Sequence, residues 1–171
     1  MSDSSAAVID SPELRDALHS CLGVERFVAE VADGAPYATS AELLAIADRV
    51  AATLTPAEVD AALAHHPRIG ERAKGDGRSQ RFSRGEQAAA EASDADLADA
   101  IAAGNAAYEA RFDRVFLIRA AGRSRAEILA ELTRRLEHDD ATEAATVASE
   151  LHDITMLRLR SLYPSTSTGA P

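Results

Sequence analysis

The chain has 171 residues and a formal net charge of −10, and 46% of its residues are hydrophobic although only 4% are aromatic. This length suits one domain that can bury a core without disulfides or metal ions. The negative charge argues against a nucleic-acid-binding protein, because such proteins need a basic face to displace counterions. No apolar stretch approaches the roughly 20 residues of a membrane span, so we expect no membrane partner.

The chain begins without the basic and apolar blocks of a signal peptide, so we expect a cytoplasmic protein. Residues 1–10 are expected to be flexible. A first helix is predicted to start at Ser11-Pro12. Its buried side is expected to carry Leu14, Ala17, Leu18 and Cys21. Because Cys21 is the only cysteine and lies in this apolar stretch, we interpret it as a buried thiol rather than a nucleophile.

Three further helix starts show the capping-box pattern, a Ser or Thr followed three residues later by Glu. The pairs are Thr39/Glu42, Thr55/Glu58 and Ser124/Glu127. The middle helix, opened by Pro56, is expected to end at His65-His66. The inward positions predicted for the other two are Leu43, Ala47, Val50 and Leu54, and Ile128, Leu129, Leu132 and Leu136.

Two longer helices complete the pattern, over Asp94 to Phe112 and from about Thr142 to Leu162. The last helix is expected to bury Val147, Leu151, Ile154 and Leu157. The only β-like run, Val115 to Ile118, is too short to found a sheet. The sequence therefore predicts an all-α fold, a compact single-domain bundle of about seven to nine helices over residues 11–163, with a disordered tail at 164–171.

One substantial loop is predicted between Gly75 and Gly85. It lies within a basic segment, Arg68 to Arg84, which contains six basic residues and two acidic ones. The segment is either a solvated basic loop or a local positive potential that attracts a small anion.

His66 is the most informative of the five histidines, because it directly precedes Pro67. The proline ring disfavours the α-helical conformation at the residue before it, so a helix must end there. On physical grounds alone, a histidine that interacts with the negative end of the helix dipole is the commoner explanation. No histidine pair has the spacing of a zinc-binding helix, and we expect no metal site.

Ser83-Arg84-Gly85-Glu86 forms another capping-box pattern, so Glu86 has an ordinary structural explanation. The N-terminus of a helix also attracts anionic ligands, and the two roles are compatible. Gln87 takes no part in such a cap, which favours a polar contact with a ligand or with the backbone. Arg119 follows four apolar residues, and it either reaches the surface or points into a pocket.

Three segments together, His66 to Glu71, Ser83 to Gln87 and Tyr108 to Gly122, resemble the signature of the 2-oxo-4-hydroxy-4-carboxy-5-ureidoimidazoline (OHCU) decarboxylases of urate breakdown. The resemblance covers roughly Leu14 to Tyr163. It implies that His66 is the catalytic residue. The substrate-binding residues that it implies are Pro67, Ser83, Arg84, Gly85, Glu86, Gln87, Phe116, Leu117, Ile118, Arg119 and Ala120. Where family members often have a glycine and an aromatic residue after the phenylalanine at 112, this chain has Asp113-Arg114.

The resemblance also implies the chemistry: decarboxylation of a small anionic ureidoimidazoline to (S)-allantoin, without a cofactor. His66 would transfer a proton, and Glu86 and Gln87 would orient the substrate. A homodimer is usual in such proteins. Two alternatives stay open, a non-catalytic interaction protein of the same fold and a general module for binding small anions.

Overall fold

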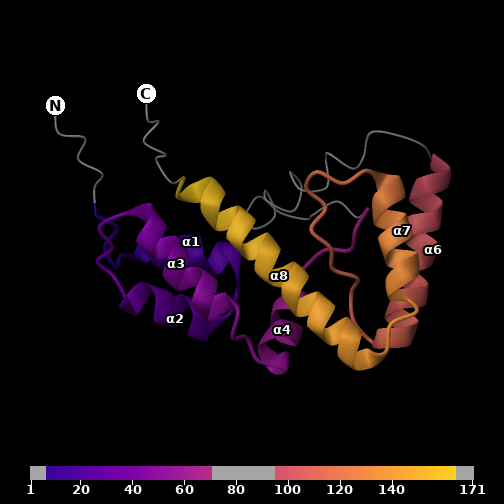
Figure 1. The fold of residues 1–171 in the computed structure, drawn as a ribbon, viewed down its shortest axis with the longest axis horizontal. Coiled ribbons are helices and arrows are strands. Elements are labelled where there is room, and N and C mark those ends of the chain that lie inside the picture. The colour runs from indigo at the N-terminus through magenta and orange to yellow at the C-terminus, as the bar shows by residue number, and fades with distance from the viewer. Residues whose placement is uncertain (1–6, 71–94, 165–171) are drawn as a thin grey trace. The chain divides into compact units, whose positions relative to one another are not determined.

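The computed structural model describes residues 7–70 and 95–164 (Figure 1). Within these ranges the chain forms seven α-helices and no sheet, which confirms the predicted all-α class. None of the helices in the described ranges is long and apolar enough to cross a membrane. The chain divides into two compact units, residues 1–54 with 152–171 and residues 55–151. The single domain over 11–163 stays a prediction.

The first unit contains α1 (Pro12–Cys21), α2 (Glu25–Asp33), α3 (Ser40–Ala51) and the C-terminal part of α8 (Asp140–Leu162). The start of α1 is as predicted, because Ser11 Oγ accepts a hydrogen bond from the Leu14 N–H at 3.1 Å. The residues of α1 that are buried are also the predicted ones, Leu14, Ala17, Leu18 and Cys21. No start signal predicted α2, and the structure shows why, since its N-cap Val24 makes no side-chain hydrogen bond.

Only half of the predicted capping box forms at the start of α3. Thr39 accepts from the Glu42 N–H, but the Glu42 carboxylate accepts from the Ala38 N–H at 2.8 Å instead of from Thr39. The buried side of α3 is also shifted. Of the predicted inward residues, Val50 and Leu54 are only partly buried. The buried residues are Leu43, Leu44, Ala47 and Ala51.

The residues just before α1 are paired to the rest of the first unit. Val8 and Tyr37 form an isolated antiparallel bridge in which each backbone N–H donates to the other's carbonyl at 2.8 Å. Asp10 accepts two hydrogen bonds from the Arg15 guanidinium. Val8 and Asp10 therefore contact other residues of the first unit, and the expected flexibility of residues 1–10 stays a prediction.

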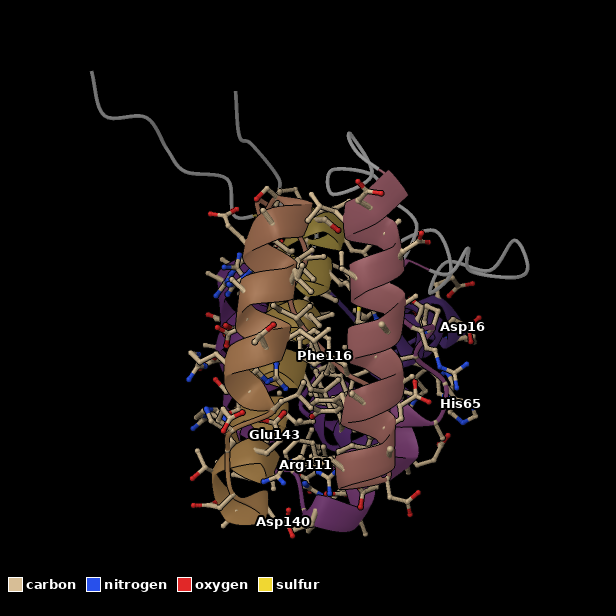
Figure 2. All side chains as sticks on the ribbon, turned by 90° about the vertical axis from the view of Figure 1, so that its right-hand side faces the viewer. Asp16, His65, Arg111, Phe116, Asp140 and Glu143 are labelled. Carbon is tan, nitrogen blue, oxygen red and sulfur yellow. The ribbon has the colours of Figure 1, made fainter. Side chains whose placement is uncertain are left out.

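The second unit contains α4 (Pro56–Leu63), α6 (Ala95–Phe112), α7 (Arg125–Arg135) and the N-terminal part of α8. Both capping boxes predicted here are complete, at Thr55/Glu58 and Ser124/Glu127. α6 and α7 lie side by side (Figures 1 and 2). A Cβ atom at Gly104 would come within 2.4 Å of Leu132 Cδ2, so the glycine allows the two helices to approach closely.

The core of the second unit is one apolar cluster between α6, α7 and the segment that connects them. Its buried members are Ile101, Tyr108, Phe112, Phe116, Ile118, Ala120, Ile128 and Leu132. Ile69, Leu129 and Leu136 are partly buried against it, so the inward position predicted for the last two is only partly correct. Along α8, the predicted burial of Val147, Leu151 and Ile154 is confirmed. Leu157 is only partly buried, whereas its neighbours Met156, Arg158 and Leu159 are buried.

Candidate active site

His66 lies in a turn that follows α4. The helix ends at Leu63, earlier than the predicted end at His65-His66, and the backbone N–H groups of His65 and His66 donate to the carbonyls of Ala62 and Leu63 at 3.3 and 3.0 Å. His66 is partly buried, and His65 is exposed. The end of the helix therefore gives His66 a fixed backbone position and leaves part of its side chain accessible.

Two side chains of α6 hold the chain that follows His66-Pro67. Glu109 accepts two hydrogen bonds from the Arg68 guanidinium, from Nε at 2.5 Å and from Nη2 at 2.8 Å. This interaction lowers the pKa of the Glu109 carboxyl below its usual range. Asn105 donates from Nδ2 to the Ile69 carbonyl at 3.0 Å. The turn at His66 is thus attached to α4 on one side and to α6 on the other.

The segment Phe116 to Ala120 is mostly buried. Only Arg119 is partly exposed; the side chains of Phe116, Ile118 and Ala120 belong to the apolar cluster, and Leu117 is 5% exposed. Figure 2 shows Phe116 where α6 and α7 face each other. Since Ile69 packs against the same cluster, the structure attaches the His66 turn and this segment to one shared core.

A buried ion pair lies under the segment. Arg135, at the end of α7, and Glu143, near the start of α8, form an ion pair at 2.5 Å with side chains only 0% and 1% exposed. Arg135 also donates to the Leu117 carbonyl at 2.7 Å, and its guanidinium lies 4.6 Å from the centroid of the Phe116 ring. The pair therefore supports both the backbone and the aromatic side chain of the segment.

Two more groups complete the hydrogen bonding of Glu143. His138 Nδ1 lies 2.9 Å from Oε2, and the Tyr108 hydroxyl donates to Oε1. Burial raises the pKa of the Tyr108 hydroxyl, and the contact with the Glu143 carboxylate raises it further. Tyr108 therefore stays protonated and acts as a donor in this network.

One edge of the segment is already occupied by hydrogen bonds within the protein. The Arg119 N–H donates to Glu150 Oε2 at 2.7 Å, and the Arg119 carbonyl accepts from Arg123 Nε at 3.1 Å. In contrast, no described residue provides a hydrogen-bond partner for the N–H or the carbonyl of Ile118. Ile118 thus keeps its backbone groups available, whereas those of Arg119 are used.

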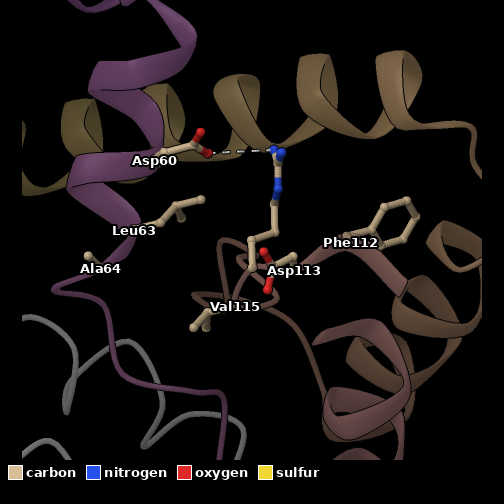
Figure 3. Close-up of a pocket in the computed structure, with 7 residues that line it drawn as sticks. Asp60, Leu63, Ala64, Phe112, Asp113 and Val115 are labelled. Atoms are coloured by element: carbon tan, nitrogen blue, oxygen red, sulfur yellow. Dashed lines mark ion pairs between the residues drawn. The ribbon is translucent and has the colours of Figure 1, made fainter. Parts of the chain in front are cut away.

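A pocket of about 470 Å³ adjoins both segments (Figure 3). It lies between residues that precede His66 and residues that precede Phe116, and Arg114 Nη1 lies 3.9 Å from Asp60 Oδ1. Neither His66 nor Phe116 to Ala120 lines it. The lining residues are Asp60, Leu63, Ala64, Phe112, Asp113, Arg114 and Val115.

The remaining predicted site residues, Ser83, Arg84, Gly85, Glu86 and Gln87, lie outside the described residues. So do the predicted Gly75–Gly85 loop and all of the basic segment after Arg68 and Ile69-Gly70. Within the described ranges, no three His, Cys, Asp or Glu side chains are grouped as a metal site would require.

The protein-family model described as OHCU decarboxylase matches residues 8–160. The chain belongs to the OHCU decarboxylase family. Members of this family are carboxy-lyases that act in urate degradation, so the chain is a decarboxylase.

Solved structures agree with membership of the OHCU decarboxylase family. A crystal structure of OHCU decarboxylase in the presence of (S)-allantoin is 28% identical, with a TM-score of 0.74 over 86% of this chain and 97% of that chain. A crystal structure of (S)-allantoin synthase is 15% identical with a TM-score of 0.60, over 87% of this chain and 49% of that one, and supports the fold. No match was found among curated protein sequences.

The departure from the family pattern after Phe112 has a backbone consequence. Asp113 has a φ of 53°, in the left-handed region where glycine is favoured and aspartate is better tolerated than most residues. Glycine is the residue that the family resemblance led us to expect at this position. Both Asp113 and Arg114 line the pocket.

Four residues that the sequence did not single out hold the candidate site together: Asn105, Glu109, Arg135 and Glu143. Asn105 and Glu109 are spaced four residues apart and so lie on one side of α6. Arg135 comes three residues after the inward Leu132, and a charged residue at such a position is the signal that could have pointed to a buried pair.

Proposed function

We propose that this chain catalyses the cofactor-free decarboxylation of OHCU to (S)-allantoin. The observation that carries the proposal is its 28% identity, over 97% of that chain, to an OHCU decarboxylase crystallised in the presence of (S)-allantoin. The match of residues 8–160 to the family model supports the same reaction. The ligand class is accordingly a small ureidoimidazoline.

The substrate explains why the reaction needs no organic cofactor. One ring carbon carries the carboxylate and a hydroxyl, and the adjacent carbon carries the ureido group and a double bond to nitrogen. When the bond to CO₂ breaks, its electron pair forms a carbon–carbon double bond, and the electrons of the C=N bond move to nitrogen, which takes up a proton. The enol then loses its hydroxyl proton and gains a proton at the ureido-bearing carbon, which gives allantoin.

His66 is the proton-transfer residue in this proposal. An unperturbed imidazole titrates near neutral pH, so it can accept the hydroxyl proton and return a proton to carbon. Its partly exposed position in the turn after α4 supports this role. Protonation from one face only would give the (S) enantiomer, whereas the reaction without enzyme gives a racemate.

The other proposed residues hold the substrate. Glu86 and Gln87 would accept from and donate to the ureido group and the ring N–H groups, with Ser83, Arg84 and Gly85 around them. Pro67 and the segment Phe116 to Ala120 would form the opposite wall. No described residue forms a hydrogen bond with the N–H or the carbonyl of Ile118, and this supports a backbone contact at that residue rather than at Arg119.

We also propose that the protein is cytoplasmic and forms a homodimer. Both proposals come from the family rather than from a described interface. Analytical ultracentrifugation of the purified chain tests the second, with a dimer mass as the expected result and a monomer at all concentrations as the contradicting one.

A coupled assay tests the proposed function. OHCU is generated in place from urate by enzymatic oxidation and hydrolysis, and circular dichroism follows the optical activity of the allantoin that forms. We expect optically active (S)-allantoin to form faster than in the absence of the protein. Racemic allantoin formed at the uncatalysed rate would contradict the proposal and would favour a non-catalytic protein that binds small anions.

Glu86→Gln tests whether Glu86 binds ligand or only caps a helix. Glutamine can still close a capping box, so the melting temperature should hardly change. It replaces an acceptor by a donor where the ligand's own donors point, and an unmatched group costs roughly 1–3 kcal/mol, or about 5- to 150-fold in affinity. Calorimetric titration with allantoin measures this loss. A lower melting temperature with unchanged affinity would leave Glu86 only a cap.

A further inference from the structure

We propose that Glu109 and Asn105 of α6 are positioning residues that set the place of the His66 imidazole for proton transfer. Neither residue belongs to the proposed catalytic or substrate-binding set. The inference rests on the proposed function, because it assigns a role in the reaction at His66.

The first contact is the pair between Glu109 and Arg68, two residues after His66. Both carboxylate oxygens of Glu109 are engaged, by Nε at 2.5 Å and by Nη2 at 2.8 Å. Such a two-point contact fixes the direction of a guanidinium as well as its distance. The Arg68 side chain is 47% exposed and that of Glu109 is 25% exposed, so the contact lies at the surface of the second unit.

The second contact comes from Asn105, one helical turn before Glu109. Its Nδ2 donates to the Ile69 carbonyl at 3.0 Å, and the residue is only 6% exposed. Oδ1 of the same amide is buried and has no hydrogen-bond partner in the part of the chain that the structure describes. The hydrogen bond to the Ile69 carbonyl is therefore the one that the structure describes for this amide.

The two contacts matter for His66 because they hold the two residues that follow Pro67. On its N-terminal side, the N–H of His66 donates to the Leu63 carbonyl at the end of α4. On its C-terminal side, Pro67 has a fixed φ angle, and the next two residues are held by α6. Gly70, at the end of the described range 7–70, has a φ of 89°, a value that glycine adopts readily. His66 is thus held between two helices, and α6 supplies the side-chain contacts.

The Arg68–Glu109 pair should affect the placement of His66 more than the stability of the fold. A partly exposed ion pair contributes little to folding, because water replaces the lost partner. Proton transfer, however, depends on placement within a fraction of an ångström, and an error of about 1 Å can cost about 100-fold in rate. Loss of the Glu109 contact should therefore lower kcat while binding and thermal stability change little.

Glu109→Gln tests this with Glu131→Gln as the matched control. Glu131 forms a similar two-point pair with Arg134 on α7, and its side chain is 20% exposed. We expect Glu109→Gln to lower kcat about 10- to 100-fold with KM changed by less than about threefold. The melting temperatures of Glu109→Gln and Glu131→Gln should be the same. Glu131→Gln should keep the kcat of the wild type. An unchanged kcat, or a rise in KM alone, would overturn the proposal.

Two further variants test the partners. Arg68→Met should lower kcat as much as Glu109→Gln, and the double variant should be no slower than either single one, because both remove the same contact. Asn105→Ala should lower kcat in the same direction. An additive loss in the double variant would show that Arg68 acts on the substrate itself, and would overturn the positioning role of the pair.

A measurement without turnover keeps this inference separate from the proposed function. The imidazole resonances of His66, assigned in ¹⁵N-histidine-labelled protein with a His66→Ala variant, should shift in Glu109→Gln and stay in place in Glu131→Gln. If the wild type shows no turnover but these resonances shift, the positioning contact stands and the proposed reaction fails. If the wild type turns over OHCU but neither kcat nor the resonances change, the positioning role fails alone.

Discussion

The two parts of the candidate site that the structure describes, the turn His66 to Gly70 and the segment Phe116 to Ala120, are held by different means. Both pack on the same apolar cluster. The turn is held by an ion pair at the surface and by one amide, whereas the segment is held by a guanidinium that is completely buried.

The difference in burial decides what each contact does. Water can replace a lost partner around Arg68 or Glu109, so their pair determines placement more than stability. No water reaches Arg135 or Glu143, so the loss of either residue leaves the other as an uncompensated buried charge. Loss of Arg68 or Glu109 should therefore lower the free energy of unfolding less than loss of Arg135 or Glu143.

Arg135→Met should have the largest effect on stability. It removes the positive charge, leaves the Glu143 carboxylate buried, and frees the Leu117 carbonyl that Arg135 holds. Breaking a buried pair in this way typically costs about 3–5 kcal/mol, which denaturant unfolding would measure. Arg134→Met, at the neighbouring exposed position, should change stability little. A loss below about 1 kcal/mol for Arg135→Met would show that the buried pair does not hold the segment.

Asp113→Gly should have a smaller effect, and it concerns two positions with positive φ, Gly70 and Asp113. The turn ends at a glycine with positive φ, Gly70, whereas the segment is preceded by Asp113 at a φ of 53°. Glycine adopts this region without a steric penalty. We expect the free energy of unfolding to rise by up to about 1 kcal/mol. The gain is limited because glycine also raises the conformational entropy of the unfolded chain. Asp113→Val should lose stability, and equal stability of both variants would argue against backbone strain here.

The pH dependence of the surface pair should give the smallest effect. Arg68 lowers the pKa of Glu109 from its ordinary value of 4.5. Because the pKa is lower in the folded state, the ionised Glu109 stabilises the fold above pH 4.5. This stabilisation is lost as the pH falls through the folded-state pKa. The difference in melting temperature between wild type and Glu109→Gln should therefore shrink between pH 7 and pH 3. A difference that grows on acidification would contradict the assigned cause.

The sequence predicted the features that local chemistry determines. Ser11, Thr55 and Ser124 each cap the helix expected of them, because a cap needs only residues three positions apart. α2 was missed because Val24 provides no side-chain cap. The family signature likewise lies in short segments, which made the fold class and the family predictable.

The sequence could not show the contacts between segments distant in the chain. Glu109 lies 41 residues after Arg68, and Asn105 lies 36 residues after Ile69. Helical periodicity places Asn105 and Glu109 on one side of α6. It does not predict which distant segment of the chain they contact. For the same reason, Leu136 was expected to face inward, but it is the C-cap of α7 and only partly buried, whereas Arg135 next to it is fully buried.

The central claim, that the turn after α4 carries the proton-transfer residue, is tested most directly by His66→Ala compared with His65→Ala. The two histidines are adjacent, and only His66 is partly buried. His66→Ala should lower kcat for OHCU about 10²- to 10⁴-fold while the free energy of unfolding changes by about 1 kcal/mol or less. His65→Ala should keep nearly full turnover. Near-normal turnover in His66→Ala would contradict the account and leave His66 as a histidine at a helix end.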